Sequence, residues 1–222
     1  MAKYGMVIDL STCFRDRACM IGCKFINRIP SKYEAVSGGV ELYRLRPVDW
    51  EEGKYPDVKW LSIPVSCQHC DTPTCMAACA EGAITKRDDG IVVIDKEKCI
   101  GCSSYSCVSA CPYLAIYIWD GKADMCDFCL GNGKLERDGI TYCAEICPCY
   151  KTKLFGDLND PTSEVAKLVA SGAARQLCPQ FGTGPNVYYV PPFNYKAEWD
   201  QLSQNQLFLK ALELRKKDLV VA

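Results

Sequence analysis

Short apolar and β-branched runs recur along the first half of this chain, and none of them is long. Residues 4–10 and 58–65 each form one such run. Residues 84–94 and 115–125 each contain two runs divided by an Asp-Gly step, which is a strong sequence signal for a β-hairpin. The pattern therefore predicts two single strands and two hairpins.

Helical periodicity comes in short pieces. Residues 74–80 and 106–111 have helical character, and Pro112 and Pro148 each stop the chain from continuing as helix. Residues 27–57 contain proline, glycine and charge with no clean period. We expect this segment to be an inserted surface loop, either a spacer or a contact for a partner.

The last quarter of the chain is predicted to add a helix, a strand and an amphipathic tail. Ser163 can cap a helix that runs to about Ala174. Residues 186–190 are rich in valine and tyrosine and predict a short strand. Residues 198–221 carry leucines among charges, which is typical of an amphipathic helix that packs on its own chain or on a partner.

The chain has 222 residues, enough for one or two domains. Its 26 basic and 27 acidic residues are interspersed, which argues against the basic stripe of a nucleic-acid-binding protein. It has no run of about 18 apolar residues, and its start does not resemble a secretory signal. We expect a chain that is soluble or peripheral to a membrane, and favour the cytoplasm slightly over export on a partner's twin-arginine signal.

All but two of the 17 cysteines fall into four groups. In chain order the groups are Cys13, Cys19 and Cys23; Cys67, Cys70, Cys75 and Cys79; Cys99, Cys102, Cys107 and Cys111; and Cys126, Cys129, Cys143 and Cys147. The second and third groups both read C-x2-C-x4-C-x3-C, close to the C-x2-C-x2-C-x3-C-P run of bacterial ferredoxins. In such a run three sulfurs on a tight loop wrap one cubane cluster, and the fourth points toward a second cluster. The spacing therefore predicts iron–sulfur clusters held by motifs that work in pairs.

Two other uses of so many cysteines fit the sequence less well. Structural zinc normally takes two C-x2-C knuckles separated by a finger-length spacer and does not need the C-x3-C-P ending. Disulfides are disfavoured by the odd count and the regular spacing. The single histidine, His69, lies inside the second group, and we expect it to be a residue near a cluster or at the surface and not a ligand.

Asp16 stands where the first group would carry a second thiolate, and with it the ligand positions suffice for four cubanes. A carboxylate oxygen is harder than a thiolate and holds iron less tightly. Either Asp16 ligates a fourth iron, or this corner loses its iron and leaves a 3Fe-4S cluster. Arg15 and Arg17 flank Asp16 and either shift the potential of that cluster or only solvate the loop.

The four groups in this order resemble those of the four-cluster, ferredoxin-like β subunits of molybdenum and tungsten oxidoreductases of the dimethyl sulfoxide reductase family. The resemblance covers roughly residues 4–190. It is carried by Met6-Val-Ile-Asp-Leu10, Cys67-Gln-His-Cys70, Cys99-Ile-Gly-Cys102, Ala110-Cys-Pro-Tyr113, Phe155-Gly-Asp-Leu-Asn-Asp-Pro161 and Gly182-Thr-Gly-Pro-Asn-Val-Tyr-Tyr189.

The resemblance implies an α+β fold in which one ferredoxin-like unit is inserted into another, with short hairpins and helices around four iron–sulfur clusters. The outer unit would be residues 1–27 with 120–160, and the inner unit residues 58–119. An inserted loop, 28–57, would separate them, and 161–222 would be an extension for partner packing.

The resemblance also implies which cysteines share a cluster, because in that family the first motif pairs with the fourth and the second with the third. The implied ligand sets are Cys13, Asp16, Cys19 and Cys147; Cys126, Cys129, Cys143 and Cys23; Cys67, Cys70, Cys75 and Cys111; and Cys99, Cys102, Cys107 and Cys79. Three clusters would be 4Fe-4S, and the Asp16 site would hold 4Fe-4S or 3Fe-4S.

The chain departs from the family pattern in three places. Asp16 replaces a cysteine, Ala80 follows Cys79 in place of a proline, and four residues, 103–106, stand in the third motif where two are usual. Cys149 and Cys178 fall outside the motifs, and we expect them to be non-ligands, either of which could substitute if Asp16 does not bind.

By resemblance, the chain would be a non-catalytic subunit that relays electrons to or from a molybdopterin catalytic subunit. A separate membrane anchor or a soluble donor would meet it at the other end. A free-standing polyferredoxin shuttle is an alternative, although a small shuttle would not need the inserted loop and the C-terminal extension. A zinc-binding interaction module is a third. Such clusters span about −700 to +450 mV, so the sequence leaves the direction of electron flow open.

Overall fold

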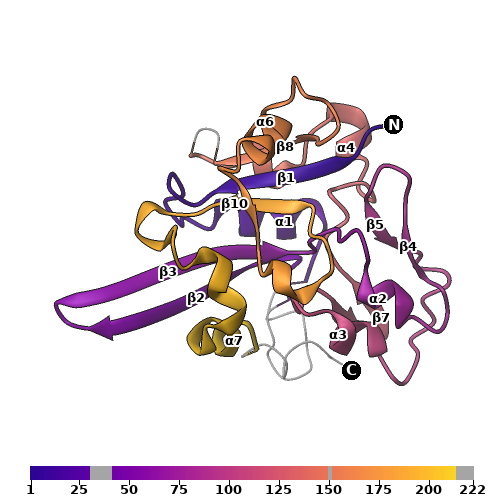
Figure 1. The fold of residues 1–222 in the computed structure, drawn as a ribbon. Coiled ribbons are helices and arrows are strands. Elements are labelled where there is room, and N and C mark those ends of the chain that lie inside the picture. Colours follow the sequence, from indigo (N-terminus) through magenta and orange to yellow (C-terminus); the bar gives the residue numbers. More distant parts are fainter. Residues whose placement is uncertain (31–41, 150–151, 214–222) are drawn as a thin grey trace.

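The computed structural model describes residues 1–30, 42–149 and 152–213. Its mixture of short helices and strands is an α+β arrangement, as expected (Figure 1). Within the described ranges, no helix is both long and apolar enough to cross a bilayer.

A four-stranded sheet joins parts of the chain that are far apart in sequence. Its order is β8 (Lys153–Asp157), β1 (Tyr4–Asp9), β10 (Val187–Val190) and β9 (Arg175–Gln176). β1 is antiparallel to β8 and parallel to β10, and both faces of the sheet are covered. The strands predicted at residues 4–10 and 186–190 are thus confirmed.

The two faces of this sheet border different apolar clusters. Met6 and Ile8 of β1 face the large core, whereas Val7 faces a small cluster with Val165 and Ala174. Val165 lies on α6 (Glu164–Ala170), which covers this face in Figure 1. The cysteine groups therefore lie on the other side of the sheet, around the large core.

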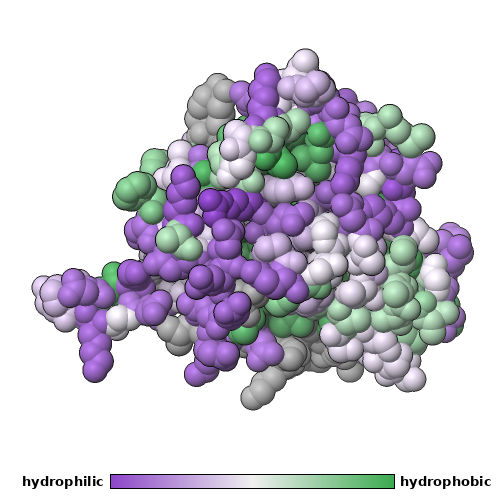
Figure 2. Space-filling view, viewed as in Figure 1, coloured by the Kyte–Doolittle hydropathy of each residue, from purple (hydrophilic) through white to green (hydrophobic). Residues whose placement is uncertain are grey.

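A long hairpin corrects the prediction that residues 28–57 form a loop. β2 (Leu45–Lys54) pairs with β3 (Asp57–Ser66) over ten positions in antiparallel register. Val48 and Trp50 on its inner half are buried. Its outer half is exposed and charged, and Figure 2 shows it as a hydrophilic arm projecting from the molecule.

β3 confirms the strand predicted at residues 58–65, whereas β2 was missed for a physical reason. Pro47 and the charges of Asp49, Glu51 and Glu52 interrupt the apolar alternation that marks a strand. The structure pairs Pro47 with Pro64 of β3, so the prolines sit opposite each other at one position of a two-stranded ladder. Residues 31–41 of the predicted loop lie outside the described residues.

Both predicted Asp-Gly hairpins and both predicted short helices are present. They are β4 (Ile84–Lys86) with β5 (Val92–Ile94), β6 (Tyr117–Trp119) with β7 (Lys122–Asp124), α2 (Thr74–Ala77) and α3 (Ser106–Ala110). α2, in the second cysteine group, packs against α3, in the third. The residues that follow each helix therefore lie close to the other group.

Three helices were not predicted: α1 (Ala18–Ile26), α4 (Lys134–Asp138) and α5 (Tyr142–Glu145). α1 packs closely on α5. A Cβ at Gly22 of α1 would lie 3.0 Å from Ile146 Cγ2 and 3.1 Å from Tyr142 Cε1, so a larger residue there would have to push these side chains back by a few tenths of an ångström. This contact brings the first cysteine group to the fourth.

The C-terminal part packs on the chain itself. Ser163 caps α6 by accepting a hydrogen bond from the N–H of Ala166, and the helix ends at Ala170, short of the predicted Ala174. The predicted tail helix begins as a 3-10 turn (Trp199–Gln204) and continues as α7 (Gln206–Glu213).

Aromatic contacts join this tail to the long hairpin. Phe208 of α7 lies edge-on to Trp50 of β2, with ring centroids 5.3 Å apart. Further 3-10 turns cover Pro179–Phe181 and Phe193–Tyr195. The prediction for residues 214–221 lies outside the described residues.

Candidate metal centres

Four small cavities in the structure are each lined by four of the predicted ligand side chains. Cavity I has Cys13, Asp16, Cys19 and Cys147; cavity II has Cys23, Cys126, Cys129 and Cys143; cavity III has Cys67, Cys70, Cys75 and Cys111; cavity IV has Cys79, Cys99, Cys102 and Cys107. Each predicted ligand position therefore lines one cavity, together with the three partners that the resemblance implies.

Short helices deliver the fourth side chain of cavities III and IV. Cys111 follows α3 of the third motif and lines cavity III, whose other three cysteines belong to the second motif. Cys79 follows α2 of the second motif and lines cavity IV with three cysteines of the third. The four residues inserted in the third motif leave Cys107 at the cavity.

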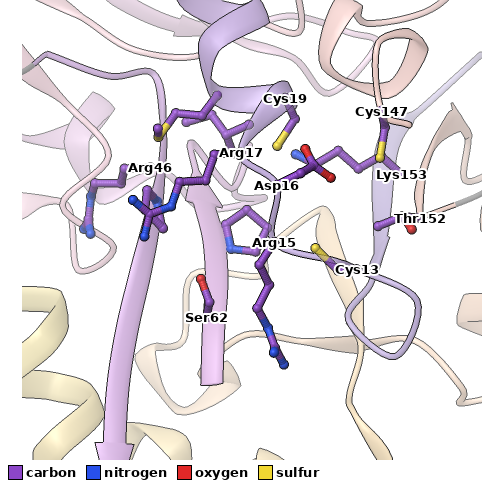
Figure 3. Close-up of a pocket in the computed structure, with 14 residues that line it drawn as sticks. Cys13, Arg15, Asp16, Arg17, Cys19, Arg46, Ser62, Cys147, Thr152 and Lys153 are labelled. Atoms are coloured by element: carbon purple, nitrogen blue, oxygen red, sulfur yellow. The ribbon is translucent and has the colours of Figure 1, made fainter. Parts of the chain in front are cut away.

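The loop before α1 forms one wall of cavity I (Figure 3). Arg15 and Arg17 adopt left-handed backbone conformations, with φ of 60° and 64°, and this tight curve brings Cys13, Asp16 and Cys19 to one side. Cys147 approaches from the segment after α5.

The two arginines tie this loop to the long hairpin. Arg17 forms an ion pair of 3.0 Å with Asp49 of β2, and the Arg15 guanidinium lies over the Trp60 ring of β3 at 4.5 Å. Both contacts are to the hairpin, so the arginines do more than solvate the loop: they hold it in place.

Asp16 lies at the exposed edge of cavity I. Its Oδ1 accepts a hydrogen bond of 2.6 Å from the N–H of Ala18, at the start of α1. Its Oδ2 is 3.6 Å from the Sγ of Cys149, a buried thiol just beyond Cys147. The thiol of Cys149, which belongs to none of the four predicted ligand sets, thus lies beside Asp16, the only carboxylate in those sets.

Lys153 of β8 lines both cavity I and cavity II. It pairs with Ile8 across the sheet on the core-facing side and is only 6% exposed. Its ammonium finds no hydrogen-bond partner among the described residues. Burial lowers the pKa of Lys153, but the nearby thiolates, Cys19 foremost, outweigh this and raise it.

The ligand thiols are in surroundings that favour a bound cation. Burial, followed by the charges of Cys111 and Cys70, raises the pKa of Cys75 to about 12. Burial and the charge of Cys79 raise the pKa of Cys107 to about 11. Bound iron would offset both effects, because it neutralises the thiolates that burial and mutual repulsion disfavour. The donor sets therefore fit iron–sulfur clusters.

Among the described residues, no three histidine, cysteine, aspartate or glutamate side chains lie close enough together to bind one metal ion. The sulfurs of each cavity surround a space instead of meeting at a point.

His69 is fully buried and lines none of the four cavities described above. The N–H of Val92 donates a hydrogen bond of 3.1 Å to its Nδ1. Its ring stacks on Phe128, which lines cavity II. This position agrees with the expectation that His69 lies near a cluster. The alternative expectation, that His69 lies at the surface, is wrong.

Arg44 is a structural residue of the site that the sequence analysis missed. Its guanidinium binds both carboxylate oxygens of Asp124 at 2.9 Å and also contacts Asp127 and Asn27, each at 2.9 Å. It lines cavity II and joins the end of α1 to the fourth motif. It lies in the segment predicted as a loop, so no periodicity marked it.

This donor chemistry defines an iron–sulfur protein, and comparison with known proteins gives its family. A model of the 4Fe-4S dicluster domain matches residues 58–158. The chain is 38% identical to Protein NrfC of Escherichia coli over 197 residues, which is 87% of this chain and 82% of that protein. It is 35% identical to a subunit of sulfite dehydrogenase from Allochromatium vinosum (86% and 84%) and 35% identical to a subunit of tetrathionate reductase from Salmonella typhimurium (85% and 72%).

The chain belongs to the family of iron–sulfur subunits of molybdopterin oxidoreductases. It is a non-catalytic electron-transfer subunit of an oxidoreductase complex, and its catalytic partner is another chain.

Proposed function

We propose that cavities I to IV each hold one iron–sulfur cluster and that the chain carries electrons through all four. The observation that carries this proposal is the lining of each cavity by four potential ligands, three from one motif region and one from a distant one. Three of the clusters would be 4Fe-4S, and the one in cavity I would be 4Fe-4S or 3Fe-4S.

The same linings support two nested units. Cavities I and II take their side chains from the first and fourth groups, and cavities III and IV from the second and third. We infer that residues 58–119 form an inner unit enclosed by an outer one built from 1–27 and 120–160.

When bound, each cluster supplies one-electron redox chemistry. The chain holds the sulfurs, excludes water and sets the order of the sites. Cavities I and II share Lys153. Phe128, which lines cavity II, stacks on His69 of the loop that holds the cavity III cysteines. Cys75 of cavity III and Cys107 of cavity IV are close enough for their charges to interact.

These three links support a route I–II–III–IV, in either direction. At one end we expect the molybdopterin catalytic subunit, and at the other a separate membrane anchor or a soluble donor. Location in the cytoplasm or export with the partner stays a prediction.

The test is to purify the full chain under anaerobic conditions and to measure iron, zinc and the visible spectrum on one sample. We expect about fifteen to sixteen iron atoms per chain, with visible absorption that dithionite bleaches. Iron near zero with stoichiometric zinc would contradict the proposal.

A matched pair of variants tests the ligand sets. Cys126→Ala should lose the cluster of cavity II, and Cys178→Ala, at a buried cysteine outside the four sets, should keep all four.

A further inference from the structure

Cys149 lies beside the corner of cavity I that Asp16 lines, although it does not itself line the cavity. Its S–H donates a hydrogen bond of 3.6 Å to Asp16 Oδ2, so the thiol and the carboxylate lie side by side at one edge of the cavity. Cys149 also lies next to Cys147, whose Sγ is 3.5 Å from the backbone carbonyl oxygen of Cys149.

The surroundings of the two candidate ligands differ. Cys149 is only 6% exposed, whereas Asp16 is exposed to solvent. Asp16 already accepts a hydrogen bond from the N–H of Ala18 through Oδ1, and this bond holds the start of α1. A thiolate is also the softer ligand and binds cluster iron more tightly than a carboxylate does.

A second observation shows that cavity I is built for a buried anionic group. The Lys153 side chain extends into the cavity beside Cys19 and Asp16 (Figure 3). Its ammonium is buried without a hydrogen-bond partner among the described residues, a costly arrangement unless negative charge lies close by. A cluster held by buried thiolates supplies that charge.

We propose that Cys149, and not Asp16, is the fourth ligand in cavity I, where it would hold a 4Fe-4S cluster with Cys13, Cys19 and Cys147. This inference rests on the proposed function. As the S–Fe bond forms, the S–H bond of Cys149 breaks. Sulfur supplies both electrons of the new bond, the proton leaves to solvent, and nothing is oxidised or reduced.

The assignment accounts for the cysteine count. All but two of the 17 cysteines already belong to the four sets, and the assignment of Cys149 would give every proposed cluster four thiolate ligands. Cys178 alone remains, buried in the large apolar core. Asp16 is left with a structural role, as the acceptor for the N–H of Ala18.

The test compares Cys149→Ala, Asp16→Ala and Cys178→Ala in the full chain, each purified anaerobically. Iron is counted, and EPR spectra are taken before and after dithionite. We expect about sixteen irons in the unaltered chain and in the Asp16 and Cys178 variants. Cys149→Ala should lose about one iron and gain the EPR signal of an oxidised 3Fe-4S cluster.

The opposite pattern, with the three-iron signal in Asp16→Ala and not in Cys149→Ala, would overturn the assignment. An unaltered chain that already shows that signal would overturn it as well. Absence of iron from every sample would instead contradict the proposed function.

Cys149→Ser provides a second measurement in case the alanine variant does not fold. If sulfur ligates iron, serine at this position should change the EPR signal or midpoint potential of one cluster and leave three unchanged. No change in any cluster would overturn the assignment.

Discussion

The imidazole of His69 lies nearly flat on the ring of Phe128, with ring centroids 3.7 Å apart and an angle of 26° between the planes. The two residues occupy the same position in two C-x2-C runs, one in the second motif and one in the fourth. Both have positive φ and both rings are fully buried, so the stack lies inside the protein between the two motifs. This stack is a direct contact between the proposed inner and outer units.

Phe128→Ala should therefore weaken the fold. The ring is fully buried, and removing it should lower the free energy of unfolding by about 3–5 kcal/mol. Denaturant unfolding of the iron-loaded chain, followed by loss of visible absorption, measures the change. Phe193→Ala removes a ring that is 94% exposed and should change stability by less than about 0.5 kcal/mol. Equal effects of the two substitutions would show that the stack contributes nothing.

Lys153→Met should lower the reduction potentials of the clusters in cavities I and II and leave those in III and IV unchanged. The ammonium lines only the first two of these cavities, and positive charge favours the reduced, more negative state. We expect a shift of about 59 mV or more, a tenfold change in a one-electron equilibrium.

EPR-monitored redox titration measures these potentials. Lys153→Arg keeps the positive charge, so the potentials should stay close to those of the unaltered chain. Lys98→Met, at an exposed lysine, is the control for a change in net charge. A uniform shift of all four clusters would contradict the prediction.

Arg44→Met should destabilise the chain by about 3 kcal/mol, because it removes the guanidinium that both partly buried carboxylates bind and leaves only the Lys96 pair with Asp124. Arg87→Met breaks an exposed pair with Asp89 and should cost less than about 1 kcal/mol. Denaturant midpoints of the two variants, measured side by side, make the comparison. A similar loss of stability in both variants would mean that the contacts between Arg44 and its partners do not stabilise the fold.

The ion pairs of Asp124 with Arg44 and Lys96 predict that the free energy of unfolding depends on pH. Burial would raise the pKa of the Asp124 carboxyl, but hydrogen bonds and charge from Arg44, aided by Lys96, bring it below its usual value. Its contribution to stability should thus be present above the unfolded pKa of about 3.9 and fall as pH drops through the folded pKa. Asp124→Asn should flatten the unfolding free energy below about pH 4. An unchanged slope would contradict this.

Removal of iron should unfold most of the chain. Cys67, Cys75, Cys107 and Cys111 belong to the large buried core, so cluster loss leaves unligated thiols and empty space at its centre. Chelation under reducing conditions, followed by near-UV circular dichroism and limited proteolysis, should show lost tertiary structure. Iron and sulfide added back anaerobically should restore it. An iron-free chain that keeps its native tertiary structure would contradict this prediction.

Local patterns explain which parts of the fold could be predicted. The hairpins β4–β5 and β6–β7 were found because an Asp-Gly turn and two β-rich runs lie within a few residues of one another. β8 was missed since it is defined by pairing with β1, almost 150 residues away, and both its faces are covered. No alternation of apolar and polar residues therefore marked it.

The candidate site, like the fold, was predictable only where its features are local in the sequence. The spacing of cysteines within a motif is local and identified cluster ligands directly. The pairing of Cys23 with the fourth motif depends on the packing of α1 against α5, and α1 is a short helix with glycine in its middle. Only family resemblance suggested that pairing. Lys153 and Arg44 carried no signal, because a single charged residue in a strand or loop looks the same whether it faces solvent or a cavity.

The place of β1 in its sheet has a consequence for biosynthesis. This strand is translated before both of its neighbours, β8 and β10, which end at Asp157 and Val190. All four cysteine groups lie between β1 and β8 in the sequence. β1 therefore takes its place in the sheet only after all four cysteine groups have been translated. Pairing at such sequence distance is slow. The sheet therefore forms late, when every side chain of the proposed ligand sets is already part of the chain.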